Sequence, residues 1–265
     1  MTDLEYRVIP AAPGAETLAP LVFLHEGLGS MTLWRSFPDE VHERCGGPRS
    51  LVYSRRGYGR SPVVREPRPL TYMHDEADHE LPMLLAELDI ERPVLIGHSD
   101  GASIALLYAG SCKSVTALVA MAPHVFVEPE SLDGADAALA TFTSTDMSTR
   151  MARHHTDPAA TFHGWNDAWR SAQFRDWNIT DRLAWITAPV LMIQGTADQY
   201  GTLAQLDAIE LGVSGPVQRL VLDGIGHAPH AESPDVVIDA IARHITALAR
   251  QSSTDRSSGA GRRSR

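Results

Sequence analysis

The stretch Val94-Leu-Ile-Gly-His-Ser-Asp-Gly-Ala-Ser-Ile-Ala-Leu-Leu-Tyr-Ala109 decides the fold. Its first three residues are an apolar run typical of a buried strand, and residues 102–109 are small and apolar, as in a buried helix. Between them lies Gly97-His-Ser-Asp-Gly101, a G-x-S-x-G motif whose serine projects above the sheet on a tight turn. The motif alone is weak, and a capping serine on an ordinary turn is the alternative. The flanking strand and helix favour a nucleophilic Ser99.

Two further loops supply the partners that a serine nucleophile needs. His227 ends the segment Leu222-Asp-Gly-Ile-Gly-His227 and is the expected base, although His230 is a second histidine in the same loop. Asp198 ends Gln194-Gly-Thr-Ala-Asp198 and is expected to orient the imidazole. Each loop directly follows an apolar run, so the three side chains are expected at the same edge of one sheet.

Apolar runs and helical periodicities alternate along the chain, which predicts a mostly parallel, twisted sheet flanked by helices. The predicted strands are residues 21–24, 51–53, 94–96, 115–121, 190–193 and 217–222. The predicted helices are residues 72–88 (with a kink at Pro82), 102–109, 202–211 and 236–249. Residues 124–186 contain four tryptophans and helical fragments, and we expect them to form a helical cap. The predicted division is a core of 1–123 and 187–250, a cap of 124–186 and a disordered polar tail of 251–265.

Composition excludes several classes of protein. The chain has 265 residues, with 23 Lys+Arg against 33 Asp+Glu and a net charge of −10, which argues against a nucleic-acid-binding protein. No run approaches the about 18 apolar residues of a membrane span, and no apolar signal core begins the chain. Cys45 and Cys112 cannot form a disulfide framework and suit a reducing compartment. We therefore expect a cytoplasmic protein with a small-molecule substrate; whether it forms a homodimer stays open.

These motifs resemble those of the α/β-hydrolase superfamily over nearly all of residues 4–249. His25-Glu-Gly-Leu-Gly-Ser30 is similar to the family's oxyanion loop, and Arg55-Arg-Gly-Tyr-Gly-Arg-Ser61 to its Arg-Gly-x-Gly-x-Ser loop. The resemblance implies an α/β-hydrolase fold and two backbone N–H donors for an oxyanion, those of Gly27 and Asp100. The short chain with one cap is similar to small-molecule esterases or thioesterases, enol-lactone hydrolases and carbon–carbon-bond hydrolases.

Three residues depart from the family pattern. Glu26 stands where the family has glycine, Asp100 places a carboxylate beside the oxyanion site, and Ser54 replaces the usual aspartate. Two acids would repel an anionic intermediate unless they are paired, and Arg55 or Arg56 would neutralise one of them. One interpretation is an ion-pair network of Glu26, Arg56 and Asp100; the other is that these groups bind a polar substrate group or tune His227.

The sequence thus predicts a cofactor-independent serine hydrolase. It would cleave an ester, lactone or thioester of a small, fairly apolar acid through an acyl-enzyme on Ser99. His124 and Trp165 are candidate pocket residues, and no metal or cofactor is expected, because neither H-E-x-x-H nor a phosphate loop is present. The alternatives are a carbon–carbon hydrolase, a lyase or cyclase with the same triad, and a ligand-binding protein with little turnover.

Overall fold

A seven-stranded sheet forms the centre of the protein; the structure is a computed structural model that describes residues 2–111 and 113–260. The strand order is β1-β3-β2-β4-β5-β6-β7; β1 runs antiparallel to β3, and the other neighbours pair in parallel. The strands are β1 (Tyr6–Ile9), β2 (Leu21–Leu24), β3 (Ser50–Tyr53), β4 (Val94–His98), β5 (Ala117–Met121), β6 (Val190–Gly195) and β7 (Val217–Leu222). The predicted mostly parallel sheet is confirmed.

Strand β1 is the one strand of the described sheet that the apolar pattern does not predict. Tyr6 and Arg7 are exposed, and Val8 and Ile9 are half-buried, so the segment has no continuous apolar run. It lies at the edge of the sheet, where only one side needs a partner strand.

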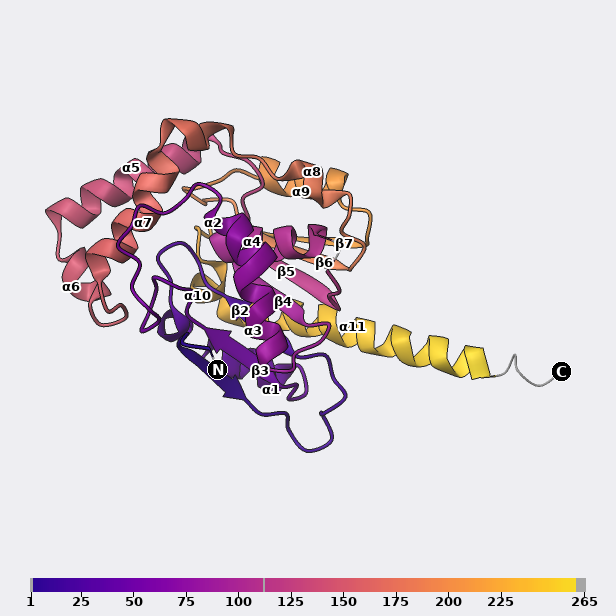
Figure 1. The fold of residues 1–265 in the computed structure, drawn as a ribbon. Coiled ribbons are helices and arrows are strands. Elements are labelled where there is room, and N and C mark those ends of the chain that lie inside the picture. Colours follow the sequence, from indigo (N-terminus) through magenta and orange to yellow (C-terminus); the bar gives the residue numbers. More distant parts are fainter. Residues whose placement is uncertain (1, 112, 261–265) are drawn as a thin grey trace.

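Alternate residues of each strand bury themselves on opposite faces of the sheet. In β2, Leu21 and Phe23 belong to one apolar cluster, and Val22 and Leu24 belong to the other. Helices cover both faces, as Figure 1 shows. Their bounds are α1 (Phe37–Arg44), α2 (Tyr72–Asp75), α3 (Leu81–Glu87), α4 (Asp100–Gly110), α5 (Pro129–Ser144), α6 (Met147–Met151), α7 (Pro158–Arg170), α8 (Thr180–Leu183), α9 (Ala204–Gly212), α10 (Pro229–Glu232) and α11 (Pro234–Ala260).

The predicted helix 72–88 is divided into three parts. A wider turn, Glu76–Glu80, lies between α2 and α3. Pro82 has no N–H to donate to the preceding turn, which leaves carbonyl oxygens there without their helical partner. The ammonium of Lys113 donates to the carbonyls of Ala77 and Asp78, each at 3.0 Å. The lysine thus stabilises the interruption that the proline causes.

The segment between β5 and β6 contains α5, α6, α7 and α8, and two short turns of 3₁₀ helix complete the fold at Met31–Trp34 and Ala172–Asp176. Figure 1 shows α5, α6 and α7 side by side at one end of the sheet. These helices lie in the stretch that the sequence predicts as a cap. They supply tryptophans that close the pocket described below.

The C-terminal helix corrects one prediction. Helix α11 includes the predicted helix 236–249 but continues to Ala260, so the expected disordered tail of 251–265 is helical over 251–260. Extending a helix that is already nucleated adds one hydrogen bond per residue, whereas starting a helix is costly, and composition alone does not register this difference. Residues 261–265 and Cys112 lie outside the described residues.

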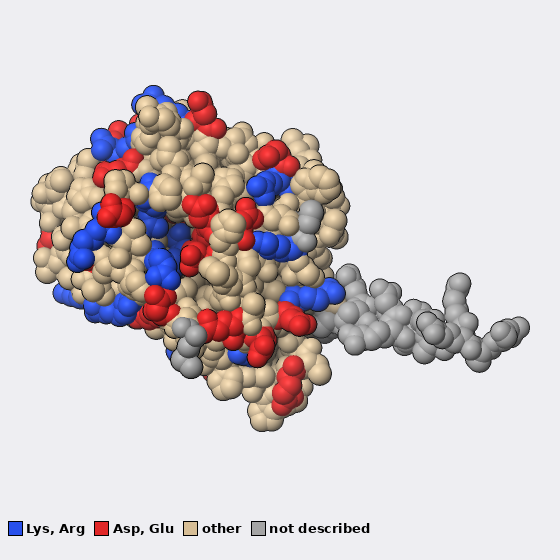
Figure 2. Space-filling view, viewed as in Figure 1, with Lys and Arg blue, Asp and Glu red and all other residues tan. Residues whose placement is uncertain are grey.

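The surface carries both signs of charge. Figure 2 shows Lys and Arg side chains interspersed with Asp and Glu over the visible face. Several of them pair, for example Arg7 with Asp39 and Arg56 with Asp3, both at 2.8 Å. In the part of the chain that the structure describes, no helix combines the length and apolarity needed to cross a membrane.

Candidate active site

Ser99 occupies a strained turn between β4 and α4. Its backbone has φ 52° and ψ −121°, a positive φ that non-glycine residues rarely adopt. The turn needs glycine on both sides, because a Cβ on Gly101 would lie 2.0 Å from the carbonyl oxygen of Leu24, and one on Gly97 would lie 2.3 Å from that of Gly101. The G-x-S-x-G spacing is therefore a steric requirement of this turn, and it leaves the Ser99 hydroxyl facing the loops that follow β6 and β7.

The structure brings the three predicted catalytic side chains into one hydrogen-bonded chain. Ser99 Oγ lies 2.9 Å from His227 Nε2. On the other side of the ring, His227 Nδ1 lies 2.8 and 2.9 Å from the two carboxylate oxygens of Asp198. We assign the proton to Nδ1 because a carboxylate can only accept, which leaves Nε2 free to accept the Ser99 proton. This geometry can activate the serine as a nucleophile.

Asp198 is held in its ionised form. Its side chain is 1% exposed. The carboxylate also accepts hydrogen bonds from the N–H of Tyr200 at 2.9 Å and from Gln194 Nε2 at 3.3 Å. Burial raises the pKa of Asp198, but the hydrogen bond and charge of His227 outweigh this effect, so the pKa lies below its ordinary value. A charged Asp198 can stabilise the imidazolium that forms when His227 takes a proton.

The peptide group between Glu26 and Gly27 is fixed from behind. The Glu26 carbonyl accepts hydrogen bonds from Arg55 Nη2 and His25 Nδ1, both at 2.8 Å. His25 Nε2 accepts from the N–H of Arg55 at 3.1 Å, so the imidazole is neutral with its proton on Nδ1. Burial, followed by the charge of Arg55, lowers the pKa of His25 well below its ordinary value, consistent with this tautomer.

Fixing that carbonyl also fixes the N–H of Gly27, because both belong to one planar peptide group. The N–H of Gly27 and that of Asp100, at the start of α4, make no hydrogen bond to any residue of the described chain. Both residues line the same pocket as Ser99. The two N–H groups are thus available to a ligand at this position.

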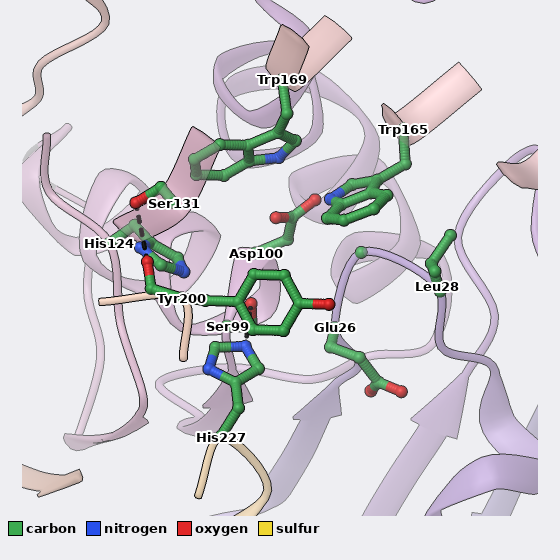
Figure 3. A pocket seen from close by; sticks show the side chains of 11 residues that line it. Glu26, Leu28, Ser99, Asp100, His124, Ser131, Trp165, Trp169, Tyr200 and His227 are labelled. Atoms are coloured by element: carbon green, nitrogen blue, oxygen red, sulfur yellow. Dashed lines mark hydrogen bonds between the residues drawn. The ribbon is translucent and has the colours of Figure 1, made fainter. Parts of the chain in front are cut away.

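A small pocket, about 80 Å³ in volume, lies over Ser99 (Figure 3). Its lining is largely apolar and aromatic, and the predicted pocket residues His124, Trp165 and Glu26 are among it. The complete lining is Glu26, Gly27, Leu28, Ser99, Asp100, His124, Ser131, Trp165, Trp169, Tyr200 and His227. The Trp165 indole packs so closely on Gly27 that a Cβ there would lie 2.1 Å from Nε1. Glycine is therefore required at this position.

The rings around His227 include two further histidines. The His124 ring lies 5.8 Å from that of His227 and 5.0 Å from that of Trp169. Burial lowers the pKa of His124 to about 3, and the nearby His227 adds to this effect, so His124 is neutral at ordinary pH. His98 Nε2 donates to the backbone carbonyl of His227 at 2.7 Å and so holds the loop that carries His227.

The two unexpected acids have different partners, and neither partner is Arg56. Glu26 Oε2 lies 3.5 Å from His98 Nδ1. Burial opposes ionisation, yet His98 and the neighbouring histidines hold the pKa of Glu26 well below its usual range. Asp100 Oδ2 accepts from the Tyr72 hydroxyl at 2.5 Å. Burial raises the pKa of Asp100, and the charge of Arg55 partly offsets the rise.

The expectation that Arg56 lies near the pocket is therefore corrected. Arg56 points outward and pairs with Asp3 at 2.8 Å and with Glu80 at 3.7 Å. Arg55 is the arginine that is buried against the oxyanion loop, with 2% of its surface exposed. Arg56 begins a turn directly after Arg55, so the two side chains leave the backbone on different sides.

Four pocket residues were not among the predicted site residues. Trp169 lies four residues after Trp165 on α7, so both face the same side of the helix, and this spacing is visible in the sequence. Tyr200 is two residues from Asp198, and its ring lies 4.6 Å from that of His227. Leu28 lies in the quoted oxyanion loop. Nothing in the sequence marks Ser131, which donates to the Tyr200 carbonyl at 2.7 Å.

No three His, Cys, Asp or Glu side chains within residues 2–111 and 113–260 converge as a metal site would require.

The comparisons with known proteins agree with the fold. The sequence model of the alpha/beta hydrolase family matches residues 21–240. The chain belongs to the alpha/beta hydrolase family.

Solved structures of this family superpose over most of the chain. An enol-lactonase from Burkholderia xenovorans LB400 superposes with a TM-score of 0.70 and 18% identity, covering 92% of this chain and 96% of the enzyme. A thermophilic esterase from Thermogutta terrifontis gives a TM-score of 0.68 and 19% identity, covering 92% of this chain and 93% of that one. Identities this low establish the shared fold alone.

Sequence relatives match over short segments. Epoxide hydrolase A of Mycobacterium tuberculosis is 37% identical over 76 residues, which is 28% of this chain and 24% of that protein. An sn-1-specific diacylglycerol lipase of Danio rerio is 38% identical over 90 residues, 34% of this chain and 26% of the lipase. The chain thus spans about a quarter of the length of these curated relatives.

Proposed function

We propose that this protein is a cofactor-independent serine hydrolase that forms an acyl-enzyme on Ser99. The observation that carries the proposal is the continuous chain from Ser99 Oγ through His227 to Asp198, with contacts of 2.9 and 2.8 Å. A buried, charged aspartate, an imidazole whose Nε2 faces the serine, and a serine on a positive-φ turn are the parts that nucleophilic acyl transfer requires.

In the proposed reaction, Ser99 Oγ attacks the substrate carbonyl while His227 Nε2 takes the hydroxyl proton. The N–H groups of Gly27 and Asp100 hold the oxygen that becomes negative. The imidazolium, stabilised by Asp198, then gives its proton to the leaving group as the bond to the acyl carbon breaks. Water, deprotonated by His227, attacks the ester of Ser99; the proton returns to Ser99 Oγ, and the acid leaves.

The pocket supports a small and fairly apolar acyl group. Its volume of about 80 Å³ and its walls of Trp165, Trp169 and Leu28 leave little room for a long chain. The proposed substrates are therefore esters, lactones or thioesters of small acids. The esterases and the enol-lactonase among the structures that share the fold support this choice. The composition, with a net charge of −10 and two cysteines, supports a cytoplasmic setting.

The first test is hydrolysis of a chain-length series of p-nitrophenyl esters and acyl-CoA thioesters by the wild type and Ser99→Ala. We expect the variant to lose at least about 10³-fold in kcat, because nothing else in the pocket replaces the nucleophile. Ser144→Ala is the matched control, since Ser144 is exposed on α5 and donates only to the Ala140 carbonyl. It should retain wild-type activity.

Labelling with a fluorophosphonate, followed by intact mass, separates the outcomes. Turnover and labelling that both depend on Ser99 support the hydrolase. Labelling without turnover of any ester or thioester supports an activated serine but contradicts ester cleavage, and favours lactone or carbon–carbon chemistry. Wild-type turnover by Ser99→Ala would overturn the covalent route.

A further inference from the structure

Asp100 is a buried carboxylate next to the nucleophile, and one of its oxygens has no partner. Its relative exposure is 0%, and it lines the pocket over Ser99. Oδ2 accepts the hydrogen bond from Tyr72, and the Trp169 indole N–H also acts on the carboxylate and lowers its pKa. No described residue lies within hydrogen-bond distance of Oδ1. Figure 3 shows the carboxylate pointing away from His227, toward Trp165 and Trp169.

An unsatisfied buried carboxylate oxygen is unfavourable and rare in folded proteins. The other carboxylate oxygen, Oδ2, is held by two hydrogen bonds in series. Trp169 Nε1 donates to the Tyr72 hydroxyl at 3.0 Å, and that hydroxyl donates to Oδ2. This relay fixes the plane of the carboxylate and leaves Oδ1 as an acceptor in a fixed position. A fixed acceptor in a substrate pocket selects ligands that carry a donor.

The triad determines which part of the substrate meets Oδ1. His227 Nε2 must reach the leaving group to protonate it, so the leaving group lies beside His227. The acyl part then extends to the other side of Ser99. That is the side on which Asp100, Trp165 and Trp169 lie.

The charges nearby favour a neutral donor over a cation. The positive charges of Arg55 and Arg68 already act on Asp100. Arg55 is fully buried and remains charged, because burial alone does not outweigh the acidic and phenolic groups around it, and its pKa lies above its ordinary value. A substrate ammonium would have to enter beside these guanidinium groups, whereas a hydroxyl would not be repelled.

We propose that the acyl group of the substrate carries a hydroxyl that donates a hydrogen bond to Asp100 Oδ1. This inference rests on the proposed hydrolase function and narrows it to esters, lactones or thioesters of small hydroxy acids. A substrate hydroxyl would satisfy a buried oxygen that otherwise has no donor, whereas the deoxy analogue would leave it unsatisfied. We therefore expect a preference of about 10–100-fold in kcat/KM for the hydroxyacyl substrate over its deoxy analogue.

The experiment compares matched ethyl esters in a pH-stat. The series is ethyl butyrate, its 2-hydroxy and 3-hydroxy derivatives, the corresponding methoxy compounds and the corresponding amino compounds. A methoxy group retains the oxygen but has no hydrogen to donate, so the hydroxy-to-methoxy ratio reports the hydrogen bond rather than polarity. The enzymes are the wild type, Asp100→Asn, Tyr72→Phe and Ser144→Ala.

Each variant has a defined expectation. In Asp100→Asn, the amide oxygen takes the Tyr72 bond and the NH₂ group faces the pocket, so the hydroxy-to-methoxy ratio should fall to about one. Tyr72→Phe keeps Oδ1 but removes the hydrogen bond that orients the carboxylate, so the preference should be reduced but not lost. Ser144→Ala is the control, because Ser144 is exposed on α5 and donates to the Ala140 carbonyl; its ratio should equal that of the wild type. Labelling of Ser99 shows that each variant is folded.

The outcomes are distinguishable from those for the proposed function. A hydroxy preference of at least tenfold in the wild type supports the inference, even if Asp100→Asn does not fold. Hydrolysis that depends on Ser99 but is equal for hydroxy, methoxy and deoxy esters overturns the inference and leaves the hydrolase function intact. A tenfold preference for an amino ester over the hydroxy ester also overturns it, in favour of a cationic acyl group. No hydrolysis and no labelling overturn both.

Discussion

The guanidinium of Arg55 donates a hydrogen bond of 2.8 Å to the carbonyl oxygen of Glu26. That carbonyl and the N–H of Gly27 are the two ends of one peptide group, so a donor on one end orients and polarises the donor on the other. Arg55 is buried and does not line the pocket, and its hydrogen bond reaches the proposed oxyanion site through this peptide. It is therefore a positioning residue for the proposed oxyanion site.

Arg55→Lys should lower kcat by about 10–100-fold with little change in KM. Lysine keeps the charge but replaces the planar group that contacts the carbonyls of His25 and Glu26, at 3.2 and 2.8 Å. Loss of one oxyanion donor costs about 10²–10³-fold, and a misaligned donor should cost less. Steady-state kinetics on a p-nitrophenyl ester measure the change.

The neighbouring arginine provides the control for this prediction. Arg56→Lys removes contacts to Asp3 and Glu80 on the surface and should leave kcat within about twofold. A change in KM with unaltered kcat in Arg55→Lys would show that Arg55 acts on substrate binding and contradict a role in the oxyanion site.

Gly27→Ala should be strongly harmful because of one side chain, Trp165. Gly27 does not adopt a positive φ, so the cost is steric: the new Cβ would lie 2.1 Å from Nε1 of the indole. We expect kcat/KM to fall by about 10²-fold in the wild-type background, and by less than about tenfold when Trp165 is leucine.

A double-mutant cycle tests this coupling. A second cycle serves as the control and uses Trp169→Leu in place of Trp165→Leu. This substitution removes the other cap tryptophan of the pocket but leaves the clash between residue 27 and Trp165. If Gly27→Ala is equally harmful with and without Trp165, the indole is not the constraint, and the glycine is needed for the loop itself.

The sequence was sufficient to predict that Ser99, Asp198 and His227 lie together, but not which charged groups surround them. Ser99, Asp198 and His227 each follow an apolar run, and parallel strands bring their carboxyl ends together, so the local pattern was sufficient. The pairing of Arg55 rather than Arg56 with the oxyanion loop depends on the direction in which each side chain leaves the backbone. Hydrophobic periodicity does not determine that direction in the loop of residues 55–62, which contains the turn-forming residues Gly57, Gly59 and Pro62.

The edge strand β1 and the pocket residue Ser131 could not be predicted from the pattern of apolar residues. Strand β1 is half exposed and lacks the apolar run that marks a buried strand. Ser131 enters the pocket because α5 packs against the loop of Asp198, through contacts of Glu128 with Thr202 and Gln205. Such contacts join segments more than 70 residues apart, and local sequence patterns do not report them.

Acidification should destabilise the protein through His124. Its pKa is about 3 in the folded state, against an ordinary value of 6.5. As the pH falls below 6.5 the unfolded chain gains a proton that the folded chain does not, so the free energy of unfolding decreases until the pH reaches about 3. The contribution approaches about 1.4 kcal/mol per pH unit.

His124→Gln should therefore flatten the pH dependence of stability. Urea unfolding at pH 7, 6, 5 and 4 should show the free energy of the variant falling less steeply than that of the wild type, by about 1 kcal/mol per pH unit below pH 6. The comparison at pH 7 gives the effect of the lost ring contacts with Trp169. Parallel curves for the two proteins would contradict a buried neutral His124.

Ser99→Gly should be more stable than Ser99→Ala, although both lose the proposed nucleophile. Alanine must keep the positive φ of 52° with a Cβ, and a residue held in such a region stores about 1–3 kcal/mol. Glycine adopts this region without strain but loses about 0.5–1 kcal/mol more conformational entropy on folding. The net expectation is a gain of about 1 kcal/mol for glycine, measured by urea unfolding at pH 7. If alanine were the more stable of the two, the strain stored in the turn would be smaller than the about 0.5–1 kcal/mol of entropy that glycine loses. A glycine variant that is more stable than the alanine variant would show that the backbone at Ser99 is strained. The strained turn is what directs Ser99 Oγ to His227 Nε2, at 2.9 Å.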